Sequence, residues 1–250
     1  MRHGERGTGH SERVHFEGVL DRRGTLYWAE RTRAGKRRRQ IRSKRIMAAS
    51  AATTTPAARI LEIGCGTGEF TLPLAAYTSG WLAGVDVAPG LLRHTSGRLP
   101  ANATVCAADV ERLPFAAGTF DAVVGNAVLH HLRLERAVPE VLRVLRPGGR
   151  LCFAEPNMLN PQVFLERNVR WIGRLLYNSP GETAFVRWQI QRTLTALGVT
   201  DVAAVPFDFL YPLTPAPLIG LVERLGRVCE RLPGVREIAG SLFITGRRAP

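Results

Sequence analysis

Residues 61–70, with the sequence LEIGCGTGEF, decide the fold. A short apolar strand runs directly into three alternate glycines, Gly64, Gly66 and Gly68, and a helical stretch at 69–76 follows them. Glycine permits the positive φ angles of a tight turn and lets a ligand lie against bare backbone. The helix behind the turn presents N–H groups that have no partner within the helix. The segment therefore predicts a ligand-binding turn between a strand and a helix.

The alternation of strand and helix continues along the chain. Apolar strands are predicted at 59–64, 80–88, 104–110, 120–128 and 149–157, and helical stretches at 69–76, 89–98 and 134–145. This order is typical of βαβ units with right-handed crossovers and of a parallel sheet covered on both faces. After residue 157 the alternation stops, and we expect helices at 163–176 and 182–198 and two closing strands at 202–210 and 241–248.

Acidic residues follow the glycine turn at informative distances. Asp86 lies 20 residues after Gly66, at the end of the next predicted strand, where a carboxylate accepts hydrogen bonds from both hydroxyls of a ribose. Asp109 ends the third predicted strand and could accept from an adenine amino group. Because the carboxyl ends of parallel strands meet at one sheet edge, these groups predict a nucleoside site there.

Two glutamates indicate that the bound nucleoside is cationic. The dinucleotide pattern would place glycine at position 69, but this chain has Glu69, which opposes an anionic pyrophosphate. Glu62, directly before the turn, could hold an ammonium group. No lysine follows in the pattern of a P-loop. An adenosine with a sulfonium and an amino acid tail, S-adenosylmethionine, satisfies all of these groups.

Residues 59–157 resemble a class I S-adenosylmethionine-dependent methyltransferase of the small-molecule group that includes quinone-biosynthesis methyltransferases. The motifs LEIGCGTGEF, GVDVAP, AADVERLPF, FDAVVGNAVLHHL and LRVLRPGGRLCFAEP carry the resemblance. It implies an α/β fold with a Rossmann-like, seven-stranded, mostly parallel sheet whose last strand, 241–248, is antiparallel. It also implies S-adenosyl-L-methionine as methyl donor and S-adenosyl-L-homocysteine as product.

The resemblance assigns roles to individual positions. Gly64, Cys65 and Gly66 would line the methionine part, Asp86 the ribose and Asp109 the adenine, while Asn126 would sit by the methionine. The full set expected to bind the cofactor is Glu62, Gly64, Cys65, Gly66, Gly68, Asp86, Val87, Asp109, Val110 and Asn126.

Residues near the acceptor are less defined. Methyl transfer requires alignment and a dry pocket, and a base only when the nucleophile must lose its proton early. His131 and Glu155 are the catalytic candidates; for His131, as for its neighbour His130, the alternative is helix capping or pocket shaping. Glu155 and Asn157 end the fifth predicted strand, where orienting and capping roles are also open. No acidic cluster of the kind that binds a metal is recognisable, so we expect no metal.

The chain divides into a disordered tail at 1–14 and a single methyltransferase domain at 15–250. Within the domain we expect a helical arm or cap at 15–56, the cofactor-binding core at 57–157, a lid insertion at 158–180, and the C-terminal part of the sheet with substrate-side loops at 181–250. The apolar segment 206–218 and the lid insertion could cover the acceptor. The helix at 163–176 is basic and amphipathic, so peripheral membrane contact is an alternative to a lid.

The net charge of +13 is concentrated in residues 31–45, which hold nine Lys and Arg residues and no acid. We interpret this run as a solvated helix face, with binding to nucleic acid or anionic lipid as the alternative. A nucleic-acid methyltransferase is disfavoured because residues 125–128 read GNAV rather than an Asn-Pro-Pro-Tyr type motif. A non-catalytic S-adenosylmethionine-binding partner protein is the third possibility.

The remaining features suit a cytoplasmic enzyme. The chain has no apolar run of about 18 residues that could span a membrane, no secretory signal and no CxxC pair among its four cysteines. We therefore expect in-line methyl transfer to O, N or C of a small, fairly apolar metabolite. The oligomeric state and the acceptor are not indicated by the sequence.

Overall fold

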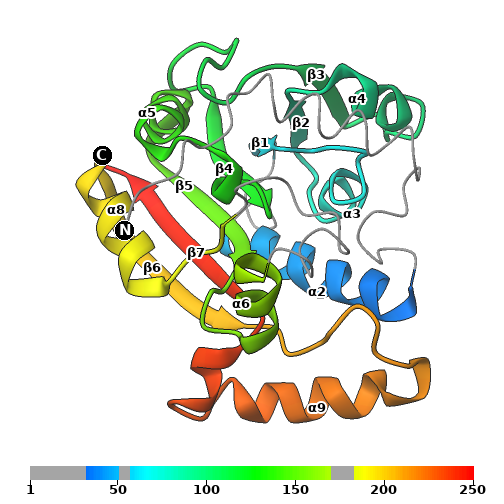
Figure 1. Ribbon diagram of the computed structural model, residues 1–250. Coiled ribbons are helices and arrows are strands. Elements are labelled where there is room, and N and C mark those ends of the chain that lie inside the picture. Colours follow the sequence, from blue (N-terminus) through cyan, green and yellow to red (C-terminus); the bar gives the residue numbers. More distant parts are fainter. Residues whose placement is uncertain (1–31, 51–56, 170–182) are drawn as a thin grey trace.

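The computed structural model describes residues 32–50, 57–169 and 183–250 (Figure 1). Seven strands form one sheet in the order β3-β2-β1-β4-β5-β7-β6. The strands are β1 (Arg59–Ile63), β2 (Trp81–Asp86), β3 (Ala103–Ala107), β4 (Phe120–Asn126), β5 (Leu145–Pro156), β6 (Val199–Phe207) and β7 (Ser241–Arg248). β7 pairs antiparallel with both β5 and β6, and the other pairs are parallel. The predicted seven-stranded sheet with an antiparallel last strand is confirmed.

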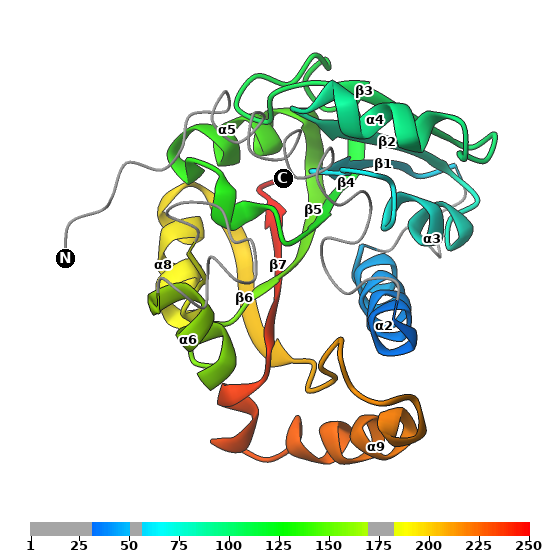
Figure 2. The same ribbon diagram turned by 45° about the vertical axis from the view of Figure 1, so that its right-hand side comes forward.

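Helices cover both faces of the sheet (Figures 1 and 2). The α-helices of the described residues are α2 (Arg33–Ala49), α3 (Thr71–Ala76), α4 (Pro89–Ser96), α5 (Leu134–Val144), α6 (Pro161–Asn168), α8 (Arg187–Ala196) and α9 (Ile219–Cys229), of which α9 lies at one end of the molecule (Figures 1 and 2). Short 3-10 turns lie at η2 (Leu129–His131), η3 (Ala216–Leu218) and η4 (Val235–Ile238). The buried residues of α5 recur at helical spacing, which explains why this segment forms a helix and packs on the sheet.

Alternate residues of the central strands feed two separate cores. On one face, Leu61 and Val123 pack with side chains of α5 and α8. On the other face, Ile60 and Val124 pack with side chains of α2 and α3. Because both faces are covered, the central strands are apolar at almost every position, as expected for parallel strands.

Several element boundaries differ from the predicted ones. The strand expected at 104–110 ends at Ala107, and the helix expected at 69–76 begins at Thr71. The arm is helical over α2, and the lid insertion contains α6; the disordered tail expected at 1–14 and residues 15–31, 51–56 and 170–182 lie outside the described residues. α9 follows the apolar segment 206–218 and was not predicted.

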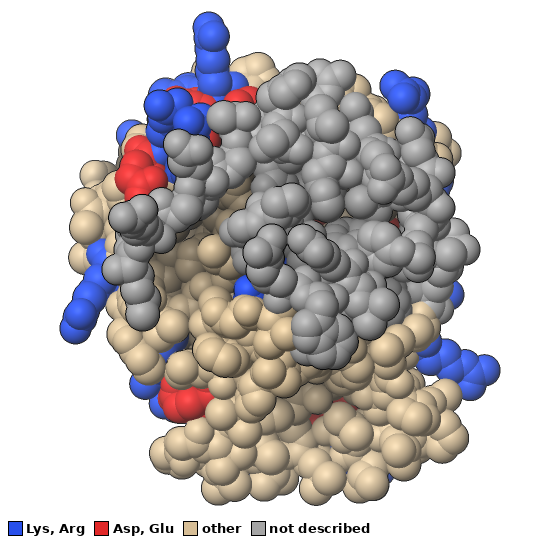
Figure 3. All heavy atoms as spheres, in the orientation of Figure 1, with Lys and Arg blue, Asp and Glu red and all other residues tan. Residues whose placement is uncertain are grey.

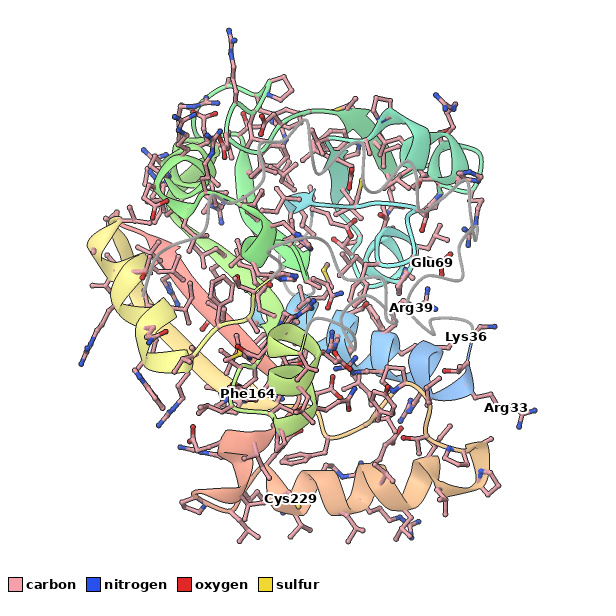
Figure 4. The ribbon with its side chains drawn as sticks, in the orientation of Figure 1. Arg33, Lys36, Arg39, Glu69, Phe164 and Cys229 are labelled. Atoms are coloured by element: carbon pink, nitrogen blue, oxygen red, sulfur yellow. The ribbon has the colours of Figure 1, made fainter. Side chains whose placement is uncertain are left out.

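The basic run is not a solvated helix face. In α2, Arg39 and Arg42 are buried, and the arginines pair with acids from distant parts of the chain. These pairs are Arg37 with Glu223, Arg38 and Arg42 with Asp208, Arg39 with Glu69 and Arg45 with Glu230. Figure 4 shows Arg39 and Glu69 side by side, while Arg33 projects outward. The expectation of a solvated face is therefore wrong for the paired arginines, whose charge is compensated.

Gly80 marks a place where the backbone cannot accept a side chain. A Cβ at Gly80 would overlap the carbonyl oxygen of Ala58 and lie 2.6 Å from the Ala58 nitrogen. Gly80→Ala should lower the free energy of unfolding by about 1–3 kcal/mol because β1 and β2 must move apart. Urea unfolding measures this change. Gly97→Ala is the control, since its Cβ would meet nothing within 4 Å; equal midpoints for both variants would contradict the expectation.

Candidate functional site

The glycine turn lies at the carboxyl end of β1. Gly64, Gly66 and Gly68 all have positive φ angles, of 68°, 50° and 78°. A Cβ at Gly64 would lie 2.5 Å from Val128 Cγ2, and one at Gly68 would overlap Thr95, so packing requires glycine at both positions. A Cβ at Gly66 would meet nothing within 4 Å in the described part of the chain. Gly66 thus presents bare backbone to open space, as a ligand-binding turn requires.

Asp86 ends β2 directly beside this turn. Its Oδ2 accepts a hydrogen bond from the Gly66 N–H at 2.9 Å, and its Oδ1 accepts from the Ala88 N–H at 2.9 Å. Burial raises the pKa of Asp86, and these hydrogen bonds and the nearby His131 oppose that rise. A carboxylate has about four acceptor positions, so Asp86 is held in place with capacity left for further hydrogen bonds.

Glu62 is the most unusual group at this edge. Its side chain on β1 is 1% exposed, and Oε2 has no hydrogen-bond partner among the described residues. Burial, together with the neighbouring Asp86 carboxylate, raises the pKa of Glu62 to about 7, and the side chain of Thr71 opposes this rise. A buried carboxyl oxygen without a partner is costly, so the site fits a ligand that brings a donor, such as an ammonium group.

Comparisons with known proteins agree with this geometry. Residues 61–153 match the family described as a methyltransferase domain. A solved S-adenosylmethionine-dependent methyltransferase from Thermotoga maritima has a TM-score of 0.65 at 18% identity, covering 94% of this chain and 99% of that chain. Residues 61–153 are therefore similar to a methyltransferase domain, and the solved structure has the same fold as this chain.

Curated relatives match the methyltransferase domain with higher identity. A malonyl-[acyl-carrier protein] O-methyltransferase of Methylococcus capsulatus is 39% identical over 152 residues, which are 59% of this chain and 54% of that protein. A demethylmenaquinone methyltransferase of Symbiobacterium thermophilum is 36% identical over 108 residues, which are 40% of this chain and 43% of that protein. The chain thus spans about half the length of these relatives or less.

The other positions expected to bind cofactor surround the turn of the methyltransferase domain. Asp109 is exposed in the loop after β3, where its Oδ1 accepts from the Glu111 N–H at 2.9 Å. Val110 and Cys65 are buried, and Val87 is half-buried. Burial raises the pKa of the Cys65 thiol, which keeps it neutral and makes it part of an apolar wall.

Asn126, at the end of β4, has a partner that the sequence did not indicate. Its Oδ1 accepts from Arg42 Nη1 at 3.0 Å, and Arg42 also donates to Asp208 and Ser241. Arg42 therefore connects α2 to the edge of the sheet that carries the site. The four-residue spacing of Arg38 and Arg42 places them on one helix face, but no sequence signal points to Asp208 as their shared partner.

Glu155 is fully buried, and both of its carboxylate oxygens have partners. Its Oε1 accepts from the Val128 and Leu129 N–H groups at 2.9 Å each. Its Oε2 lies 2.7 Å from His130 Nδ1. Both oxygens are thus engaged at η2; these contacts favour an anchoring role, and the catalytic role expected of Glu155 stays a prediction.

The remaining acceptor-side candidates have separate positions. Asn157 is fully buried, and its Nδ2 donates to the carbonyls of Glu237 and Ala239 at 2.8 Å each, next to η4. His131 is half-buried, and its ring centroid lies 4.1 Å from that of His130. In the described ranges, no group of three or more His, Cys, Asp and Glu side chains is arranged to hold a metal.

Glu155→Gln separates an anchor from a base. The amide oxygen can keep the Val128 and Leu129 N–H groups, while its NH₂ turns toward His130 and replaces contacts to a charged carboxylate by neutral ones, so the free energy of unfolding should fall by about 1–3 kcal/mol. Thermal or urea unfolding of the purified variant measures this. If the variant unfolds at the wild-type midpoint yet loses turnover, Glu155 acts in catalysis instead.

The raised pKa of Glu62 predicts a pH-dependent stability of the ligand-free protein. The folded pKa of about 7 exceeds the ordinary value of 4.5, so the neutral form stabilises the folded state. That contribution is complete below about pH 4.5 and is lost as pH rises through 7, by about 3 kcal/mol. Urea unfolding at pH 5 and pH 8 should show this loss, and Glu62→Gln should abolish it.

Asp201→Asn is the matched control for that measurement, because Asp201 is 75% exposed and asparagine tolerates its positive φ. This variant should keep the wild-type pH dependence. The same pH dependence in Glu62→Gln and wild type would show that Glu62 does not titrate in this range.

Proposed function

We propose that this chain transfers a methyl group from S-adenosyl-L-methionine to a small, fairly apolar acceptor. The proposal is carried by the buried Oε2 of Glu62, which has no hydrogen-bond partner among the described residues, together with the backbone of Gly66 and the fixed carboxylate of Asp86. Together these groups offer a site for an ammonium, a backbone surface and acceptors for a ribose.

Each residue has a task in this assignment. Glu62 accepts from the amino group, Gly66 allows the methionine part to approach the backbone, and Asp86 accepts from the ribose hydroxyls. Asp109 accepts from the adenine amino group, with Val87 and Val110 as apolar neighbours. Packing leaves no room for a side chain at position 64 or 68, so the turn stays tightly packed behind the ligand.

When bound, the donor supplies a methyl group that its sulfonium already activates, so the protein's task is alignment and exclusion of water. Asn126, fixed by Arg42, and the buried thiol Cys65 border the methionine part. His131, next to Asp86, remains the candidate for contact with the acceptor. Glu155 contributes by holding the loop that carries both histidines.

A small acceptor suits the site better than a nucleic acid. Arg37, Arg38, Arg39, Arg42 and Arg45 are engaged by acids, so this part of the basic run is compensated rather than available to phosphates. The named acceptors of the relatives, a malonyl group on a carrier protein and demethylmenaquinone, differ from one another. They support a small-molecule class of acceptor rather than one compound.

Calorimetry with S-adenosyl-L-homocysteine tests the donor site. Glu62→Gln and Asp86→Asn should each raise Kd at least about tenfold, because each removes a buried charge-assisted hydrogen bond. Asp201→Asn should bind like wild type. Wild-type protein that binds neither S-adenosylmethionine nor its demethylated product would overturn the assignment.

Transfer of a labelled methyl group then tests the acceptor. The screen should include a malonyl-carrier protein, demethylmenaquinone, other small apolar compounds and an RNA pool. Label on a small molecule is the expected result. Label on RNA alone would favour the nucleic-acid alternative, and donor binding without any transfer would favour the non-catalytic one.

A further inference from the structure

α9 (Ile219–Cys229) leaves a row of large apolar side chains open to solvent. Leu221, Leu225 and Val228 are 54%, 56% and 52% exposed. Leu218 before the helix and Leu232 after it extend the row, each 47% exposed. We call these five residues the α9 stripe. Figures 1 and 2 both show α9 at one end of the molecule, outside the layers that pack on the sheet.

The α9 stripe lies on the opposite side of the helix from its contacts with the protein. At about 100° per residue, Leu221, Leu225 and Val228 fall within about 60° of one another. The inward side carries Gly226, which packs against Phe209, and Glu223, which bonds to Arg37 at 2.6 Å. Polar bonds and a glycine therefore hold the helix in place, while its apolar side chains point away.

The charges around the α9 stripe have one sign. Both acids near the helix turn inward: Glu223 pairs with Arg37, and Glu230 pairs with Arg45 at 3.5 Å. The exposed charges beside the stripe belong to Arg224, Arg227 and Arg231. Arg227 Nη1 lies 4.0 Å from Glu223 Oε2. For Arg224 and Arg231, no ion pair is found within the described ranges. In Figure 3 the lower part of the molecule, where α9 lies in Figure 1, is broadly uncharged.

We propose that the α9 stripe binds the surface of an anionic phospholipid bilayer. A helix with leucines on one side and arginines along its flank lies in the interface plane, with the apolar groups below the headgroups and the cations on phosphates. None of the described helices is long and apolar enough to cross a bilayer, so this contact is peripheral. The proposal stands independently of the proposed methyl transfer.

Charge favours a lipid surface over a second copy of the chain. Two stripes packed together would bring Arg224 and Arg231 of both copies near one interface. Glu223 and Glu230, which could offset them, are already engaged by α2. An anionic membrane supplies the missing negative charge without displacing these pairs.

Cosedimentation of the 250-residue chain with vesicles tests the proposal. The vesicles contain phosphatidylcholine alone or with about one third phosphatidylglycerol, which supplies the anionic surface. The double variant Leu221→Gln, Leu225→Gln keeps the net charge, and its partition coefficient on anionic vesicles should fall at least about tenfold. Trp188→Gln on α8 is the control: it removes a larger side chain, 45% exposed, and should bind like wild type.

A second pair of substitutions tests the cationic flank. Arg224→Gln with Arg231→Gln should weaken binding to anionic vesicles and leave binding to neutral vesicles unchanged. Circular dichroism melting confirms that the variants fold, as expected for exposed positions. Unchanged vesicle binding by the leucine variant would overturn the proposal and assign the attraction to net charge alone. Wild-type dimers that the leucine variant converts to monomers, without vesicle binding, would assign the stripe to a second copy.

Discussion

The buried ion pair between Arg42 and Asp208 holds together segments that lie far apart in the sequence. Asp208 accepts from Arg38 at 2.6 Å and from Arg42 at 2.8 Å, and burial, which would raise its pKa, is outweighed by these two guanidinium groups, so the pKa is lowered. Its backbone carbonyl accepts from the Gly240 N–H, and its own N–H donates to Glu230. Arg42 continues the network to Asn126 at the site. The side chain and backbone of Asp208 thus link α2, the end of β6, the segment before β7 and the end of α9.

Much of the fold could be predicted from the sequence because motifs close together in the chain indicated the same structure. The glycine turn and the acid at Asp86 stand close along the chain and belong to a βαβ unit, so their spacing predicts their meeting. Ion pairs between residues far apart in the sequence could not be predicted. Arg42 and Asp208 are 166 residues apart, and many other acids of the chain could have paired with Arg42. The sequence did not predict α9, because its apolar residues follow an apolar, proline-rich segment and agree with a continued loop as well as with a helix. Glu155 shows the same limit at one residue, since a strand end suits a base and an anchor equally, and only its hydrogen bonds distinguish them.

The distribution of acids also changes one argument made from the sequence. Glu69 was expected to oppose an anionic ligand, yet its carboxylate pairs with Arg39 and with Arg98, 3.1 Å away. Burial raises its pKa, but the hydrogen bonds from Arg98 and Arg39 bring the pKa below its ordinary value. The Glu69 carboxylate is therefore neutralised by these two arginines, and the pairs join α2 and the end of α4 to the turn. The preference for a cationic ligand rests instead on Glu62, which has no such cation beside it among the described residues.

The order in which these partners leave the ribosome follows from the same network. Asn126, Asp208 and Ser241 follow Arg42 by 84, 166 and 199 residues. During translation, α2 is therefore synthesised as a cationic segment long before the carboxylate of Asp208. Contacts between residues so far apart in sequence slow folding, because the chain loses the entropy of loop closure before the contact contributes its free energy. Arg42 therefore gains its carboxylate partner only after the 166 residues that separate it from Asp208 have been synthesised.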